Sequence, residues 1–410
     1  MYGKVRKISR TTPLHLSALM SSRQMDHCLS LPCRTTLVIK MNPGRLKGNF
    51  RKNLTAEHTQ TRILCSPEPC WTLQSSTEHG SGPGEYMPSV LEIDHLTTEF
   101  ILGQGRVKAV DTVSLNLEQG KSLALVGESG CGKTMLALSV LGLIPAPPAE
   151  ITSGRIIFQG RDLLKLSEHQ LRNIRGNEIS MIFQEPMTAL NPVFTIGTQL
   201  MEPLIYHKKL SSTQAMEQAV QLMKMVGIPG PENRIHDYPH QLSGGMRQRI
   251  IIAMALACSP EIILADEPTT ALDVTIQAQI LELFKNLQQK KGTSTILITH
   301  DLGVVAQVCH DMAVMYAGRI VEHGSTALIL ARPGHPYTRG LMASLPRLDT
   351  DQELEPVMGG VPDLSQLPPG CVFHPRCPQK MDICTTKSPP MLETRYGPQV
   401  RCWLYSRQQS

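Results

Sequence analysis

The segment Gly127–Thr134 reads G-x-x-x-x-G-K-T and directly follows the apolar run Ser122–Val126. The apolar run predicts a buried parallel strand, and the apolar stretch 135–143 predicts a helix after the loop. Glycines let such a loop turn its backbone N–H groups toward phosphate oxygens, and the helix N-terminus adds partial positive charge. We therefore predict a nucleoside triphosphate site. The predicted phosphate-binding residues are Gly127, Glu128, Ser129, Gly130, Cys131, Gly132, Lys133 and Thr134.

Within this loop, two side chains have distinct expected roles. Lys133 is expected to reach the β- and γ-phosphates, and the Thr134 hydroxyl to bind Mg²⁺. Two further apolar runs also end at polar residues: 262–265 precedes Asp266 and Glu267, and 295–299 precedes His300. Ligands of open parallel sheets bind at the carboxyl ends of the strands, so we expect these residues beside the loop. Asp266 is then a candidate Mg²⁺ ligand, and Glu267 a candidate general base for an attacking water.

A second glycine-containing segment, Leu242–Arg249, places Ser243, Gly244 and Gly245 at the start of a predicted helix over 246–258. A hydroxyl and free N–H groups at a helix start form a second anion-binding site. One chain cannot easily bring two such helix starts onto one triphosphate. Two chains facing head to tail can, so we expect a dimer with shared nucleotide sites.

These segments together resemble the nucleotide-binding subunits of ABC transporters, whose LSGGQ-like signature faces ATP across a dimer interface. Met246 stands here where many members carry Gln. The resemblance runs from about Val90 to the C-terminus. It implies an α/β fold: a P-loop NTPase cassette with a mixed sheet core, an antiparallel β subdomain and a helical subdomain at about 185–255. We assign residues 87–332 to this cassette and 333–410 to a C-terminal extension.

The same resemblance implies roles for four further residues. Gln184 touches Mg²⁺ and senses the membrane partner, and His300 contacts the γ-phosphate as a switch. Asp273 communicates between the two sites of the dimer. Phe100 stacks on adenine. Cofactors implied in this way are ATP and Mg²⁺.

Segments 183–193, 242–256 and 332–341 more closely resemble the D-type ATPase of oligopeptide and dipeptide importers. The resemblance implies a bacterial importer in which ATP binding closes a heterodimer with a companion F-type ATPase and hydrolysis resets it. Two membrane permeases and a periplasmic binding protein complete it, and the chain lies on the cytoplasmic face of the membrane. The subfamily also imports nickel and some sugars. A soluble cassette acting on nucleic acid or ribosomes is disfavoured because the core is slightly acidic.

Cys371, Cys377, Cys384 and Cys402 form the pattern C-x5-C-x6-C-x17-C near the C-terminus. Four thiolates can enclose zinc or a [4Fe–4S] cluster, and four free thiols are the simpler alternative. The D-type subunits have a similar C-terminal segment, and that resemblance implies a [4Fe–4S] cluster.

Residues 1–86 differ from the rest of the chain in charge. They hold twelve Lys and Arg against five Asp and Glu and lack helix or strand periodicity. This composition is typical of a disordered leader, and a nucleic-acid-binding tail is an alternative. We favour a third interpretation, in which translation begins at Met87 because ordered pattern starts directly after it. The eleven scattered cysteines favour a reducing compartment.

Overall fold

The structure is a computed structural model and describes residues 89–103, 105–184, 189–269, 272–344 and 358–408. The chain separates into two units, Met1–His79 and Gly80–Ser410, and all described residues belong to the second. The predicted leader, 1–86, lies outside the described residues. Within them, no helix is long and apolar enough to cross a membrane.

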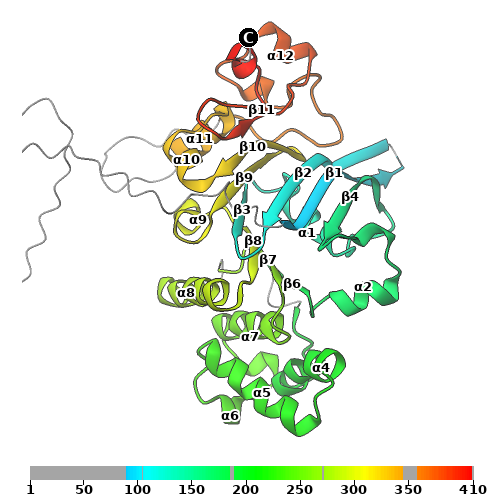
Figure 1. Cartoon of the computed structure of the whole chain (residues 1–410), viewed down its shortest axis with the longest axis vertical. Helices are drawn as coiled ribbons and strands as arrows, with labels where there is room; N and C mark the ends of the chain where they lie inside the picture. Colours follow the sequence, from blue (N-terminus) through cyan, green and yellow to red (C-terminus); the bar gives the residue numbers. More distant parts are fainter. Residues whose placement is uncertain (1–88, 104, 185–188, 270–271, 345–357, 409–410) are drawn as a thin grey trace, which may run out of the picture. The chain divides into compact units, whose positions relative to one another are not determined.

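An eight-stranded mixed sheet forms the centre of this unit (Figure 1). Its strands, in spatial order, are β11 (Leu392–Glu393), β12 (Gln399–Val400), β10 (Arg319–Ser325), β9 (Asp311–Tyr316), β3 (Ser122–Val126), β8 (Ser294–Ile298), β7 (Ile262–Asp266) and β6 (Ile179–Ile182). The strands from β9 to β6 run parallel, and β10, β12 and β11 add antiparallel pairs. Every residue of β3, β7 and β8 is buried, which explains their unbroken apolar sequences.

A second, antiparallel sheet covers the phosphate-loop side. Its order is β2 (Gly105–Glu118), β1 (Ser89–Leu102), β4 (Ala149–Phe158) and β5 (Arg161–Asp162). Helix α1 (Lys133–Val140) packs in the same core through Leu136, which joins Leu91 of β1 and Leu123 of β3. Helix α1 begins at Lys133, before the predicted start at 135, and ends at Val140, before the predicted end at 143. Gly142, just after the helix, takes a left-handed backbone (φ 61°).

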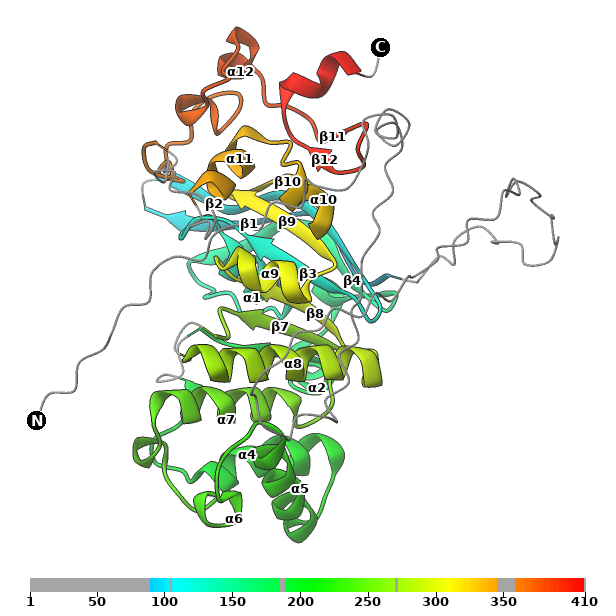
Figure 2. The ribbon, with the colours of Figure 1, turned by 90° about the vertical axis from the view of Figure 1, so that its left-hand side faces the viewer.

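Helices gather beside the β6 edge, the lower end in both Figure 1 and Figure 2. They are α2 (Glu168–Ile174), α4 (Ile196–Lys208), α5 (Ser212–Met225), α6 (Pro231–Arg234) and α7 (Gly244–Leu256). A capping box formed by Ser211 and Gln214 starts α5. The predicted helical subdomain, about 185–255, contains α4 to α6 and most of α7.

The remaining helices follow the strands of the main sheet. They are α8 (Val274–Lys291), α9 (Leu302–Val308), α10 (Thr326–Ala331), α11 (Pro336–Ala343) and α12 (Asp382–Thr386). Short 3₁₀ helices lie at Leu163–Lys165, Pro239–Gln241, His374–Arg376 and Trp403–Gln408. Strand β12 pairs with β10, placing Val400 opposite Glu322. The main sheet therefore crosses the proposed boundary between residues 332 and 333.

Candidate nucleotide site

The predicted phosphate loop lies between β3 and α1. Gly132 caps α1 with φ 107°, and a Cβ there would lie 2.2 Å from the carbonyl oxygen of Ala109. Only glycine fits this close approach. Lys133 is buried, and its Nζ donates to the carbonyls of Gly127 (2.8 Å) and Glu128 (2.9 Å). The lysine is thus held over the concave side of the loop, where phosphate oxygens would compete for its protons.

A cavity opens beside this loop. Its walls include Ser129, Gly130, Gly132, Lys133, Thr134, Gln184, Asp266 and Glu267. Phe100 of β1 and Ala109 of β2 add an apolar wall, as a site for an adenine ring requires. Phe100, for which the resemblance implied adenine stacking, thus lies in the wall of the same cavity as the phosphate loop.

Asp266 and Thr134 form the oxygen-rich corner of this cavity. Asp266 ends β7 and is only 2% exposed, and burial raises the pKa of its carboxyl group. The Thr134 side chain hydrogen-bonds to it. A hydroxyl next to a buried carboxylate suits a hard divalent cation such as Mg²⁺, which prefers oxygen ligands. These residues fit the metal that the sequence predicted here.

Glu267 contacts the two other predicted catalytic side chains, Gln184 and His300. Its Oε1 is 3.1 Å from Nδ1 of His300, and Gln184 Nε2 donates to its Oε2 at 3.1 Å. The Glu267 backbone takes the left-handed conformation (φ 46°), which is uncommon for a residue with a side chain. Its N–H donates to Ile298 of the neighbouring strand at 2.9 Å. The end of β8 therefore anchors the turn that presents this carboxylate to the cavity.

The signature residues lie elsewhere. Ser243 caps α7, its Oγ accepting from the N–H of Met246 at 3.4 Å, and both Ser243 and Gly244 are exposed. Asp273 is exposed and caps α8 in the same way. The cavity walls include neither these residues nor Gly245. One chain thus holds the loop, the acids, Gln184 and His300 together, while the signature faces outward.

Two family models match this chain. The model for ABC transporters covers residues 110–270, and that for the C-terminal region of oligopeptide/dipeptide transporters covers 321–384. The dipeptide transport ATP-binding protein DppD of Bacillus subtilis (strain 168) is 53% identical over 78% of this chain and 95% of that protein. The oligopeptide transport ATP-binding protein OppD of the same strain is 50% identical over 77% of this chain and 88% of that protein. The chain belongs to the ATP-binding proteins of dipeptide and oligopeptide ABC transporters.

A solved structure supports the same fold. The cassette MJ0796, in a dimeric post-hydrolysis state bound to ADP and Pi, superimposes with a TM-score of 0.53 at 28% identity. The match covers 58% of this chain and 98% of that one. The predicted α/β cassette fold is confirmed. As a member of this family the chain is an ATPase that uses ATP and Mg²⁺.

Sequence reasoning missed four residues of this cassette that bear on the site. Gln248 is buried in α7, and its Nε2 donates to the carbonyl of Pro268, next to Glu267, at 2.8 Å. Leu364 lines the nucleotide cavity from the C-terminal region. Tyr337 and Arg376 contact Glu128 of the phosphate loop. The segments around Tyr337 and Arg376 did carry a family resemblance, but neither periodicity nor motif chemistry gave these two residues a role.

The four C-terminal cysteines come near one another but do not form a metal site in this cassette. The Cys371 N–H donates to the carbonyl of Cys384 at 2.8 Å. Burial, with the nearby thiols adding to it, raises the pKa of Cys402 to about 11. Across the described ranges, no group of three His, Cys, Asp or Glu side chains is arranged to hold a metal ion. The structure therefore supports neither the predicted cluster nor zinc.

Proposed function

We propose that this chain is the ATP-hydrolysing subunit of a bacterial importer for dipeptides or oligopeptides. The observation that carries the proposal is the similarity to peptide-transport ATP-binding proteins along almost their whole length. A second match, to the C-terminal region of oligopeptide/dipeptide transporters, points to the same cargo class. The partners would be two membrane permeases, a periplasmic binding protein and a companion F-type ATPase. The chain would then lie at the cytoplasmic face of the membrane.

In this proposal the cavity binds ATP as its magnesium complex. The Lys133 ammonium and the loop N–H groups bind the phosphates, and Phe100 stacks on the adenine. Thr134, Asp266 and Gln184 would hold the Mg²⁺, which would supply positive charge to offset the negative charge of the phosphates. Burial raises the pKa of Asp266 despite the opposing effects of the Thr134 hydrogen bond and the Lys133 charge, and a divalent cation bound there would favour the carboxylate form.

Glu267 then acts as the general base. Its carboxylate takes a proton from the attacking water while the water oxygen approaches the γ-phosphorus. Gln184 and His300, each 3.1 Å from a different oxygen of Glu267, orient that carboxylate. His300 is 66% exposed at its side chain, against 16% for Glu267, so the histidine also reaches toward the γ-phosphate from the open side.

The signature residues Ser243, Gly244 and Gly245 would bind the nucleotide held by the partner ATPase, and Asp273 would relay between the two sites. Their exposure on this chain supports such an arrangement. The dimeric state of MJ0796 with ADP and Pi supports it as well. ATP binding then closes the two ATPases, and hydrolysis lets them separate.

Reconstitution tests this function. When the chain is co-expressed with the candidate permeases and the companion ATPase, it should co-purify with two membrane proteins and a second ATPase. In proteoliposomes its ATPase rate should rise when the binding protein is loaded with a dipeptide or oligopeptide. Stimulation by Ni²⁺ or a sugar instead would assign the cargo to one of the alternatives, and ATPase activity without membrane partners would favour a soluble cassette.

The [4Fe–4S] cluster stays a separate hypothesis for Cys371, Cys377, Cys384 and Cys402. Protein purified without oxygen should be brown and hold about four iron per chain. Stoichiometric zinc in colourless protein would replace the cluster, and metal-free protein would leave four thiols.

A further inference from the structure

The phosphate loop of this chain contains a carboxylate whose negative charge needs a positively charged partner. Glu128 is the second residue of the loop, and a negative charge there repels the phosphates that the loop binds. In the structure Arg376 pairs with it through two hydrogen bonds, from Nη1 to Oε2 at 2.7 Å and from Nη2 to Oε1 at 3.0 Å. This two-point geometry is the strongest form of an arginine–carboxylate contact. The Arg376 side chain is only 6% exposed, so solvent screens the pair weakly.

The loop backbone is held from the same side. The Glu128 N–H donates to the phenolic oxygen of Tyr337 at 2.9 Å, and Tyr337 is fully buried in α11. Its ring packs against Tyr316 and Phe373, with centroid separations of 4.7 Å and 5.5 Å. Arg376 also lies over the Tyr316 ring, 5.7 Å from its centroid. Both groups that touch Glu128 therefore belong to one packed aromatic cluster and have little freedom to move.

Arg376 also fixes a segment that reaches the cavity. Its Nε donates to the carbonyl of Met358 at 2.9 Å. Six residues later, Leu364 lines the nucleotide cavity together with Phe100 and Ala109. One side chain thus connects the charge of the loop to the position of an apolar wall of the site.

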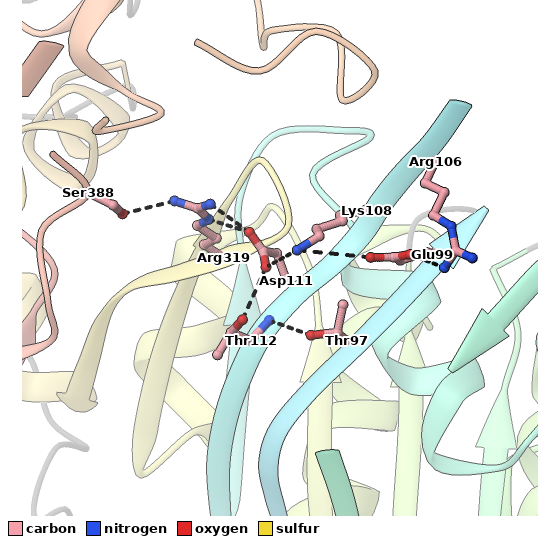
Figure 3. A network of polar contacts seen from close by, with 8 residues as sticks. All are labelled: Thr97, Glu99, Arg106, Lys108, Asp111, Thr112, Arg319 and Ser388. Carbon is pink, nitrogen blue, oxygen red and sulfur yellow. Dashed lines mark hydrogen bonds and ion pairs between the residues drawn. The ribbon is translucent and has the colours of Figure 1, made fainter. Parts of the chain in front are cut away.

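The C-terminal region has a second attachment that does not involve Arg376. Figure 3 shows Arg319 between Asp111 of β2 and Ser388, donating to Asp111 Oδ2 through Nε at 2.7 Å and to Ser388 Oγ through Nη1 at 3.0 Å. Strand β12 adds its backbone pairing with β10. A variant that loses only the Arg376 contacts therefore keeps this region docked on the cassette.

We propose that Arg376 is a positioning residue for ATP binding: it neutralises Glu128 and holds the phosphate loop, so that the C-terminal region completes the nucleotide site. The inference rests on the proposed phosphate-binding role of Gly127–Thr134. It predicts a defect in nucleotide affinity with little change in the chemical step, because the Arg376 contacts that carry the inference are made to Glu128 of the loop.

The test is a double-mutant cycle in the full chain, assayed for MgATP affinity of the chain and for the KM and kcat of the ATPase of its assembled complex. Arg376→Gln leaves the Glu128 carboxylate uncompensated and should raise Kd and KM about tenfold, with kcat within twofold of wild type. Glu128→Gln removes the repulsion, so the double variant should return to within about threefold of wild type. Arg376→Lys keeps the charge without the two-point contact and should lie between Arg376→Gln and wild type.

Two controls separate the possible outcomes. Arg339→Gln alters an exposed arginine of α11 that donates to Gln379 and Tyr405, and it should leave the KM unchanged. Lys133→Ala should abolish ATP binding, and if it does not, the loop assignment itself fails. If Lys133→Ala abolishes binding while Arg376→Gln leaves the KM unchanged, only this inference is wrong.

The cycle also distinguishes positioning from mere folding. A purely structural role for Arg376 predicts that Glu128→Gln restores nothing in the double variant, and that result overturns the proposal. If Arg376→Gln does not fold, Glu128→Ala cuts the same contact from the loop side. Amide hydrogen exchange in residues 127–132 should then accelerate about tenfold, and unchanged exchange there would equally overturn it.

Discussion

Helices α1 and α7 both begin with groups that can bind phosphate, but the two helix starts differ in how far the chain encloses them. At α1, Lys133 is 7% exposed, and the preceding loop is held by Tyr337 and Arg376 from far along the sequence. At α7, Ser243 is exposed and its hydroxyl caps its own helix. The first helix start is enclosed by the chain, and the second is open to the outside.

The glycines at the two helix starts differ in the same way. Gly132 is required internally, because a Cβ there would lie 2.2 Å from a backbone oxygen. Around a Cβ built at Gly244, the described part of the chain places no atom within 4 Å, and its φ is not left-handed. Packing and backbone geometry within the chain therefore explain the first glycine and not the second. A close approach by something outside the chain, as in our proposed dimer, would explain Gly244.

The strongest test of the enclosed site concerns its base. Glu267→Gln should keep ATP binding, since Lys133 and the loop are untouched, and should lower turnover by about 10²- to 10⁴-fold through loss of the general base. Turnover of the assembled complex and ATP affinity measure the two effects. Glu282→Gln, on the surface of α8, is the matched control and should change neither. Normal hydrolysis by Glu267→Gln would remove this residue from the mechanism.

The open helix start should act on another chain. Ser243→Arg places a bulky side chain where the partner's nucleotide would sit, so hydrolysis at the partner's site should fall by on the order of 10²-fold. ATP binding to the isolated variant should stay normal, because Ser243 lies outside its own cavity. Site-specific photolabelling in a mixed complex reads the two sites separately. Loss of this chain's own binding would refute the head-to-tail arrangement.

Much of the enclosed site could be predicted from sequence because its signals are local. The buried parallel strands β7 and β8 are mostly apolar, and each leads to a polar residue that enters the site. Asp266 is the last residue of β7, and His300 lies two residues after β8. Knowledge of strand order was not needed, since the carboxyl ends of parallel strands share one edge. The N-terminal ends of α5 and α7 are likewise capped by hydrogen bonds between residues three positions apart in the sequence.

The contacts that hold the phosphate loop from the C-terminal region could not be predicted in this way. Arg376 and Glu128 are 248 positions apart, and no periodicity links them. Strand β1 shows a related limit: it runs from Ser89 to Leu102 through register shifts after Ile93, where His95 takes a left-handed backbone. A bulge breaks the alternation on which strand prediction depends. The metal expectation for the cysteines came from resemblance, since their spacing alone is compatible with zinc, a cluster or free thiols.

Acid should destabilise the fold through the start of α11, the helix that carries Tyr337. His335 caps α11, its Nδ1 accepting from the Tyr337 N–H at 3.0 Å, and burial lowers its pKa from 6.5 to about 3. As the pH falls below 6.5 the unfolded chain binds this proton first, so stability present above pH 6.5 is lost toward about pH 3. The loss is at most about 1.4 kcal/mol per pH unit.

Urea unfolding at pH 7 and pH 5 measures this effect, with His335→Gln as the comparison. The variant keeps a side-chain acceptor for Tyr337 but cannot titrate, so its stability should fall less between the two pH values. Burial raises the pKa of Glu322, which is present in both proteins and largely cancels in the difference. Equal pH dependence in the two proteins would show that His335 does not titrate as the structure implies.

The smallest expected effect distinguishes the two helix starts most directly. Gly244→Ala adds a methyl group where the described chain leaves open space, and it removes backbone freedom from the unfolded state. The free energy of unfolding should therefore rise by about 0.4–1 kcal/mol, while ATPase activity of the assembled complex falls because the partner's phosphates lose their close approach. Gly132→Ala should do the opposite to stability, since its Cβ meets Ala109. If Gly244→Ala destabilises the isolated chain, or leaves the complex fully active, the glycine serves packing within the chain and the contrast between α1 and α7 disappears.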